Sequence, residues 1–63
     1  MLENKIAYHR KIRGISQGEL AKMLGLTASA LSKIELGKSP ITLDRANKVA
    51  TIFDTTIDDL IVK

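Results

Sequence analysis

The sequence predicts an all-α fold of five short helices, packed as one compact domain over residues 1–63. Apolar residues recur at helical spacing in several segments, and no segment has the sustained two-residue alternation of a half-buried strand, so we expect no sheet. Glycines, threonines and one serine stand where these segments would begin and end. A chain of 63 residues is also too short for a second domain with its own core.

The first two helices are predicted from the signals at their ends. The first covers roughly residues 2–12, and Gly14 is a natural stop after it because glycine adopts the left-handed conformation at low cost. Ser16 then opens a capping box with Glu19, in which each side chain can bind the backbone amide of the other residue. We therefore expect the second helix to start directly after Ser16 and to end at Gly25.

Each of the last three helices follows a threonine that can accept a hydrogen bond from the first helical turn. Thr27 precedes the third helix, predicted over about residues 28–36, while Thr42 precedes the fourth and Thr56 a short fifth. Apolar residues mark one face of the fourth helix, namely Leu43, Ala46, Val49, Ala50 and Phe53. Asp54 is expected to end that helix because aspartate tolerates the left-handed conformation better than most residues.

The composition excludes several classes of function. The chain has no cysteine and a single histidine, His9, which we expect on the surface. We therefore expect no disulfide, no metal site and no cofactor. The sequence has no nucleophile with a paired base and no phosphate-binding glycine loop, which argues against an enzyme. It also has no apolar run long enough to span a membrane and no basic and apolar leader, so we expect a cytoplasmic protein.

The charge is unevenly distributed along the chain, whose net charge is +3. Residues 1–38 hold seven Lys or Arg and three Asp or Glu, a net charge of +4. Residues 39–63 hold three basic and four acidic residues, a net charge of −1. A basic half of this kind suits a polyanionic partner such as nucleic acid.

Residues 17–37 form the most informative segment. Two helices of about eight residues would flank a turn that begins at Gly25, where a positive φ costs glycine little. Ala21 supplies the small side chain that a close crossing of two helices requires. The residues expected to face inward are Leu20, Leu24, Leu26, Leu31 and Ile34. The residues expected to face outward on the second of these helices are Ala28, Ser29, Ser32 and Lys33.

This segment resembles the helix-turn-helix of the lambda-repressor-like or Cro-type family, also called the xenobiotic-response-element family. The matching residues are Gln17, Leu20, Ala21, Leu24, Gly25, Leu31 and Ile34, with Arg10, Gly14, Ile15, Ser16, Glu35, Gly37 and Lys38 beside them. Residues 53–61 resemble the usual close of the family, so the likeness covers nearly the whole chain. The resemblance implies a compact five-helix domain that binds double-stranded DNA.

The resemblance also implies roles for individual residues. The second helix of the motif would be the recognition helix in the major groove, and its base-reading residues would be Thr27, Ala28, Ser29 and Lys33. The phosphate-binding residues would be Gln17, Ser32, Lys38 and Ser39. Arg10 and Glu35 would form an ion pair that links the first helix to the end of the recognition helix. The chain departs from the family pattern at Gly18, Ala28 and Asp54. At Ala28 a hydrogen-bonding reader is lost, although alanine can contact a thymine methyl group.

We therefore expect a sequence-specific transcriptional regulator, in particular a repressor that binds a palindromic operator as a homodimer. Such a protein would be bacterial or phage-encoded and associated with the nucleoid. The expected dimer contact is the apolar C-terminus, with Ile57, Leu60, Ile61 and Val62. The alternative is an antitoxin or anti-repressor module that binds a partner protein, which the small uncharged surface around Ala28 and Ala30 favours.

Overall fold

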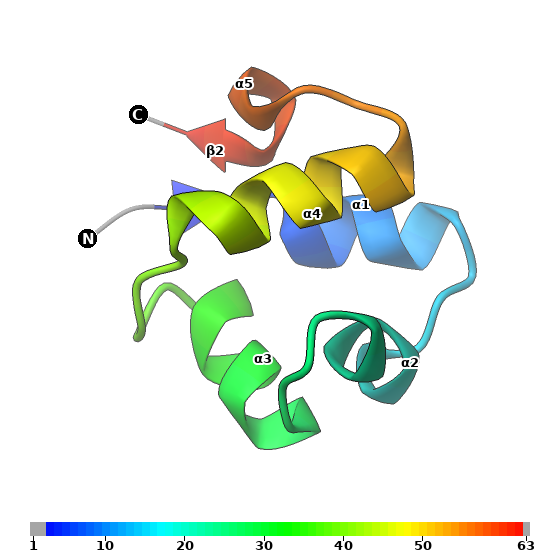
Figure 1. Cartoon of the computed structure of the whole chain (residues 1–63), viewed down its shortest axis with the longest axis vertical. Helices are drawn as coiled ribbons and strands as arrows, with labels where there is room; N and C mark the ends of the chain where they lie inside the picture. Colours follow the sequence, from blue (N-terminus) through cyan, green and yellow to red (C-terminus); the bar gives the residue numbers. More distant parts are fainter. Residues whose placement is uncertain (1–2, 63) are drawn as a thin grey trace.

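The computed structural model describes residues 3–62 and contains five helices and one pair of short strands (Figure 1). The elements, in chain order, are β1 (Glu3–Asn4), α1 (Ile6–Ile12), α2 (Gln17–Met23), α3 (Ala28–Glu35), α4 (Leu43–Phe53), α5 (Ile57–Leu60) and β2 (Ile61–Val62). The prediction of five helices is confirmed. Among the described residues, no helix has the length and apolar character needed to cross a lipid bilayer.

The two strands correct the prediction that the chain forms no sheet. They pair antiparallel, with Glu3 opposite Val62 and Asn4 opposite Ile61. Strands of two residues are too short to produce an alternating pattern, so the sequence carries no sign of them. The pairing also explains why α1 begins at Ile6 rather than near residue 2, which lies outside the described part of the chain.

The helices pack around a single core, with α4 across the middle of the molecule (Figure 1). Helix α5 and the β1–β2 pair lie on one side of α4, and α2 and α3 lie on the other side. Helix α1 packs against both α2 and α4, and α2 packs against α3. The two ends of the described chain meet in the small sheet, so both termini leave the molecule on the same side.

All five helices contribute side chains to the core. The largest fully buried side chains are Ile6, Leu20, Leu31, Val49, Phe53 and Leu60. Leu60 was expected at a dimer contact, and this prediction is wrong because its side chain is 0% exposed inside the monomer. Ile57 and Ile61 are partly buried against the core, and the side chain of Val62 lies outside the described part of the chain.

The predicted helix caps are present. Ser16 Oγ accepts a hydrogen bond from the Glu19 amide at 3.1 Å, and Glu19 Oε1 accepts one from the Ser16 amide at 3.2 Å, which completes the capping box. Thr27, Thr42 and Thr56 each accept a hydrogen bond from the amide three residues later. These local bonds satisfy amides that helix geometry leaves without a partner, so they fix where α2, α3, α4 and α5 begin.

Arg13 and His9 tie the end of α1 to the end of α4. Arg13 Nη2 donates a hydrogen bond to the Phe53 carbonyl oxygen at 2.7 Å, and its guanidinium lies 4.9 Å from the centre of the Phe53 ring. The His9 ring stacks on Phe53 with a centroid distance of 6.3 Å and is half-buried, so the prediction of a surface position holds only in part. These contacts fix the last turn of α4 against α1.

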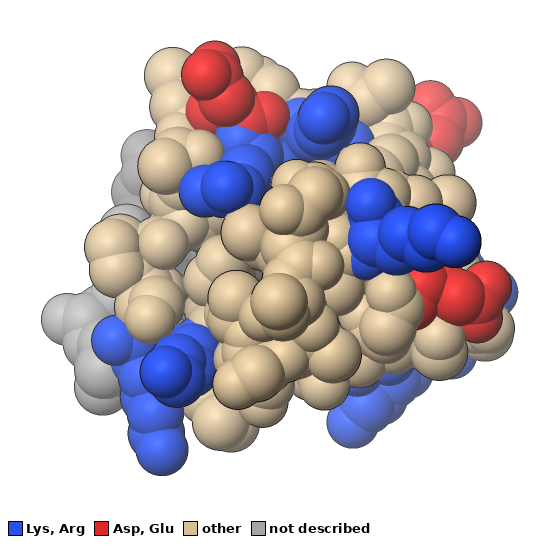
Figure 2. Space-filling view, turned by 60° about the horizontal axis from the view of Figure 1, so that its bottom comes forward, with Lys and Arg blue, Asp and Glu red and all other residues tan. Residues whose placement is uncertain are grey.

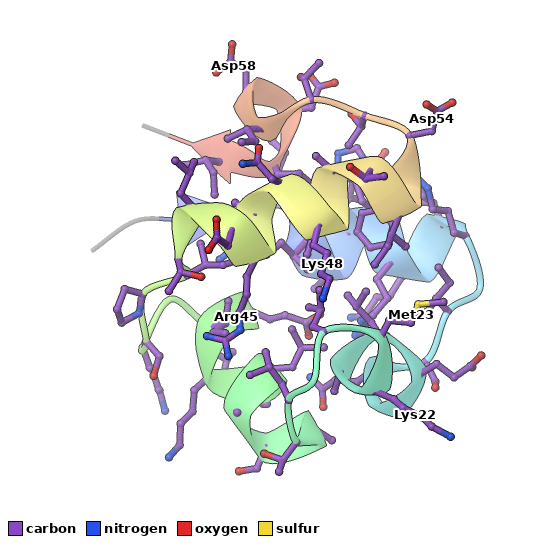
Figure 3. All side chains as sticks on the ribbon, in the orientation of Figure 1. Lys22, Met23, Arg45, Lys48, Asp54 and Asp58 are labelled. Atoms are coloured by element: carbon purple, nitrogen blue, oxygen red, sulfur yellow. The ribbon has the colours of Figure 1, made fainter. Side chains whose placement is uncertain are left out.

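Asp54 ends α4 in the left-handed conformation, with φ 54° and ψ 49°. Aspartate tolerates this region better than most residues, but a side chain with a Cβ atom still costs energy there. The Asp54 side chain is exposed and points into solvent (Figure 3). The strain at this helix end is therefore not offset by packing of the side chain.

Replacing Asp54 by glycine should raise the free energy of unfolding by about 0.5–1 kcal/mol, because glycine adopts the left-handed conformation without strain. For a domain of this size, thermal unfolding followed by circular dichroism should show a rise in Tm of roughly 2–8 °C. The matched control is Asp58→Gly, which removes the same charge from the first turn of α5 and should lower Tm. Equal increases in both variants would attribute the effect to charge and contradict the backbone argument.

Candidate nucleic-acid interface

Helices α2 and α3 form a helix-turn-helix whose turn is fixed by backbone bonds. Gly25 has φ +70°, the left-handed conformation predicted for it. The Leu26 amide then donates a hydrogen bond of 2.8 Å to the Ala21 carbonyl oxygen, which closes the end of α2. Ala21 is buried, as expected for a small residue where two helices approach closely.

Helix α3 has one buried face and one exposed face. Leu31 and Ile34 are buried against the rest of the domain. The four residues expected to read bases are all exposed, namely Thr27, Ala28, Ser29 and Lys33. Thr27 Oγ1 accepts from the Ala30 amide at 3.1 Å. Helix geometry leaves the amides of Ala28 and Ser29 without a partner inside the helix, at the positive end of the helix dipole. The structure thus brings these four residues together on one surface.

The loop after α3 is tightly bound to that helix. Gly37 has φ +75°, and its amide donates to the Ile34 carbonyl oxygen at 3.0 Å. The amides of Lys38 and Ser39 both donate to the Lys33 carbonyl oxygen, at 2.8 and 3.2 Å. Because the loop amides are occupied in this way, the exposed Lys38 side chain is the group that this loop offers to an anion. Ser39 and Ser32, also expected at phosphates, are half-buried.

Gln17 lies at the start of α2 and is directed partly inward. Its side-chain Nε2 donates a hydrogen bond of 2.8 Å to Glu35 Oε1 at the end of α3. The Gln17 side chain therefore supports the end of α3 directly. An anion would meet its backbone amide and that of Gly18, which precede the first hydrogen bonds within α2.

The predicted ion pair between Arg10 and Glu35 is present and shielded from solvent. Arg10 Nε lies 2.9 Å from Glu35 Oε2, and the two side chains are 11% and 6% exposed. Arg10 Nη1 donates a further hydrogen bond of 3.0 Å to the Ile15 carbonyl oxygen. Together with Gln17, these bonds join α1, the start of α2 and the end of α3 at one carboxylate.

Two basic residues of α4 extend this surface, and the sequence analysis did not identify them. Figure 3 shows Arg45 and Lys48 reaching from α4 toward α2 and α3, while Asp54 and Asp58 lie at the opposite end of the molecule. Arg45 and Lys48 line a hollow together with Leu24, at the end of α2, and with Thr42 and Asp44 at the start of α4. Figure 2 shows Lys and Arg side chains distributed around a largely uncharged surface on this side of the protein.

Counting charge over the two halves of the chain did not reveal that Arg45 and Lys48 belong to this surface. Residues 39–63 are acidic in sum, but the fold directs Arg45 and Lys48 toward α2 and α3 and places Asp54 and Asp58 away from them, whereas Asp44 lies beside the two basic residues. The available signal was the spacing of Arg45 and Lys48, which are three residues apart and therefore share a helix face. Among residues 3–62 no three His, Cys, Asp or Glu side chains gather in a way that could hold a metal ion.

Comparison with known proteins agrees with this geometry. The helix-turn-helix family matches residues 6–60. An uncharacterized HTH-type transcriptional regulator of Methanocaldococcus jannaschii is 34% identical over 61 residues, covering 97% of this chain and 92% of its own length. A second uncharacterized HTH-type transcriptional regulator, from Archaeoglobus fulgidus, is 33% identical over 61 residues, covering 97% of this chain and 87% of its own length.

Two solved structures have the same arrangement of helices. A Bacteroides fragilis protein assigned as DNA-binding superposes with a TM-score of 0.88 at 26% identity, covering 98% of this chain and 100% of that one. SinR, the master regulator for biofilm formation, solved in complex with DNA, has a TM-score of 0.72 at 31% identity, covering 84% of this chain and 86% of that one. These relatives are regulators and DNA-binding proteins, and the family is not a class of enzymes.

Replacing Glu35 by alanine should lower the free energy of unfolding by about 3 kcal/mol, because it leaves the shielded Arg10 guanidinium without its partner. The double variant Arg10→Met with Glu35→Leu removes both charges and should lose much less, on the order of 1 kcal/mol. Urea denaturation of wild type, single and double variants measures these differences. Additive losses in the double variant would show that the two residues contribute independently and would contradict the coupled pair.

Proposed function

Because the chain belongs to the helix-turn-helix family of DNA-binding transcriptional regulators, we propose that it binds a specific double-stranded DNA operator with α3 in the major groove. The exposed face of α3 is the observation that carries this proposal. It offers hydroxyls, a methyl group and an ammonium on a helix that is narrow enough for the groove. The opposite face of the same helix is held by the core, so the reading side chains approach DNA from a fixed base.

Few side chains would read the bases in this complex. Lys33 is the longest donor on the face and suits the O6 and N7 acceptors of guanine. Ser29 and Thr27 can donate or accept through their hydroxyls, and Ala28 can contact a thymine methyl group. Operator discrimination should therefore depend strongly on Lys33.

The surrounding basic residues would fix the position of the domain on the phosphates. Lys38, with Ser39 and Ser32 beside it, would contact one strand after α3, and the first turn of α2 at Gln17 would contact phosphate through backbone amides. Arg45 and Lys48 add positive charge on the same side of the molecule. These contacts carry no sequence information, but they supply affinity that falls as salt rises.

We further propose that the protein acts as a homodimer on a palindromic operator and represses by covering the DNA. One domain reads only a few base pairs, and a second copy supplies the missing affinity and specificity. The domain measures 26 × 24 × 20 Å, so two adjacent copies suit recognition helices about one DNA turn apart, roughly 34 Å. With Leu60 buried, the partly exposed Ile57 and Ile61 and the strand β2 are the C-terminal surface left for the contact.

Selection of bound sequences from a random pool of double-stranded DNA tests this proposal. The expected result is an enriched palindrome whose half-sites are about one helical turn apart. An enriched site without symmetry would contradict the dimer, and the absence of any enriched sequence would contradict operator recognition. Recovery of a partner protein from extracts, together with absent enrichment, would favour the alternative of a protein-interaction module.

Lys33→Ala should weaken binding to the selected operator by about 10-fold and binding to random DNA by much less, because a base contact discriminates by roughly 1–3 kcal/mol. The matched control is Arg45→Gln, which removes one positive charge outside α3. It should weaken both complexes equally and reduce the slope of log affinity against log salt by about 1. Fluorescence anisotropy over a salt series measures both quantities. Equal losses on the two DNAs for Lys33→Ala would contradict its base-reading role.

A further inference from the structure

One side chain joins the small terminal sheet to the recognition helix. Asn4 lies in β1, and its Nδ2 donates a hydrogen bond of 2.8 Å to the carbonyl oxygen of Ile34, thirty residues later in the chain. Its Oδ1 accepts a hydrogen bond of 3.2 Å from the Ile6 amide, at the start of α1. The two ends of the Asn4 amide group therefore bind two different helices.

The carbonyl that Asn4 binds lies at the C-terminal end of α3. Carbonyl groups in the last turn of a helix have no partner within the helix. The Ile34 oxygen accepts one hydrogen bond from the Gly37 amide at 3.0 Å, and Asn4 supplies a second. Since a carbonyl oxygen has two lone pairs, this acceptor is fully used. Ile34 is itself buried, so water does not readily replace either bond.

Side-chain packing between the sheet and the loop after α3 is limited. Helix α3 packs mainly against α2. A hollow of about 240 Å³ separates the loop from the strands, with Asn4 and Ile61 on one side and Pro40 and Ile41 on the other. The hydrogen bond from Asn4 is therefore a principal direct link between the sheet and α3.

Asn4 is held in place by backbone bonds to the C-terminal part of the chain. Its backbone pairs with Ile61 in the sheet, and the Lys5 amide donates a hydrogen bond of 2.7 Å to the Leu60 carbonyl oxygen. Leu60 is anchored in the core. The position of Asn4 is thus fixed by α5 and β2, and it can transmit that position to α3.

We propose that Asn4 is a positioning residue for DNA recognition, which sets the orientation of α3 relative to the terminal sheet; this inference rests on the proposed operator binding. Glu35 is held by Arg10 and Gln17, and the neighbouring Ile34 carbonyl is held by Asn4. Two anchors on adjacent residues, approached from different elements, prevent rotation of α3 about its own axis. Leu31 and Ile34 keep α3 on the core, so loss of one anchor loosens the end of the helix and shifts Lys33 on its exposed face without releasing the helix.

The test uses Asn4→Ser in the full chain. Serine keeps a short acceptor for the Ile6 amide but cannot reach the Ile34 carbonyl oxygen. The expected result is an operator affinity lowered on the order of 10-fold with affinity for random DNA within about twofold of wild type. Hydrogen exchange at the Gly37 and Lys38 amides should accelerate, whereas exchange at the end of α2, at Leu24 and Leu26, should not change.

Two further variants separate positioning from stability. Thr42→Ala removes the cap of α4, a hydrogen bond that involves neither α3 nor the elements that hold Asn4, and should lower Tm without changing the ratio of operator to random affinity. Asn4→Asp keeps the size and the Oδ1 acceptor but places an oxygen against the Ile34 carbonyl, so it should lower that ratio as well. It serves if Asn4→Ser does not fold.

The outcomes distinguish this inference from the proposed function. An unchanged affinity ratio with unchanged exchange at Gly37 and Lys38 would overturn the role of Asn4. A fall in the ratio of the same size in Thr42→Ala would also overturn it, because general destabilisation would then explain both. If the wild type selects no operator, the proposed function fails, and exchange at Gly37 and Lys38 alone decides whether Asn4 holds the end of α3.

Discussion

The shielded ion pair between Arg10 and Glu35 is the interaction on which the position of α3 depends. Burying two ions is costly unless their remaining hydrogen-bonding groups find partners. Here Ile15 supplies a carbonyl to the guanidinium and Gln17 supplies an amide to the carboxylate. Among the described residues, no buried side-chain nitrogen or oxygen lacks a partner. The geometry that satisfies all these groups brings α1, α2 and α3 together in one way, so the pair selects the orientation of α3.

Because buried residues hold α3 in place, the residues on its exposed face can differ without loss of the fold. Leu31, Ile34 and Glu35 hold the helix from inside, while Ala28, Ser29 and Lys33 have no part in the core. A hydrogen-bonding reader can therefore be lost at Ala28 without cost to the fold. In the complex we propose, the small side chain there would let the start of α3 approach DNA closely.

The sequence predicted what depends on neighbouring residues and missed what depends on the assembled chain. The caps at Ser16, Thr27, Thr42 and Thr56 were identified because a cap involves residues three apart. The terminal strands were missed because their pairing requires the two chain ends to meet. Leu60 was misplaced because a helix of four residues does not reveal which apolar residue faces inward. Arg45 and Lys48 were missed because their relation to α3 exists only across helices. The exposure of Ala28, Ser29 and Lys33 on α3 was predicted from helical spacing, whereas their base-reading role was implied only by the family resemblance.

The lysines at the end of α3 stabilise the helix in the free protein and would also contact DNA in the complex we propose. The C-terminus of a helix carries partial negative charge, and Lys33 in its last turn and Lys38 just beyond it offset that charge. Both lysines are exposed, so their ammonium groups remain able to meet phosphates or bases. The acidic side chains of Asp54 and Asp58 lie away from α3, whereas Asp44 lies beside Arg45 and Lys48. In the complex we propose, the phosphates would meet α3 on the side where Arg10, Glu35 and Asn4 bind its C-terminal end.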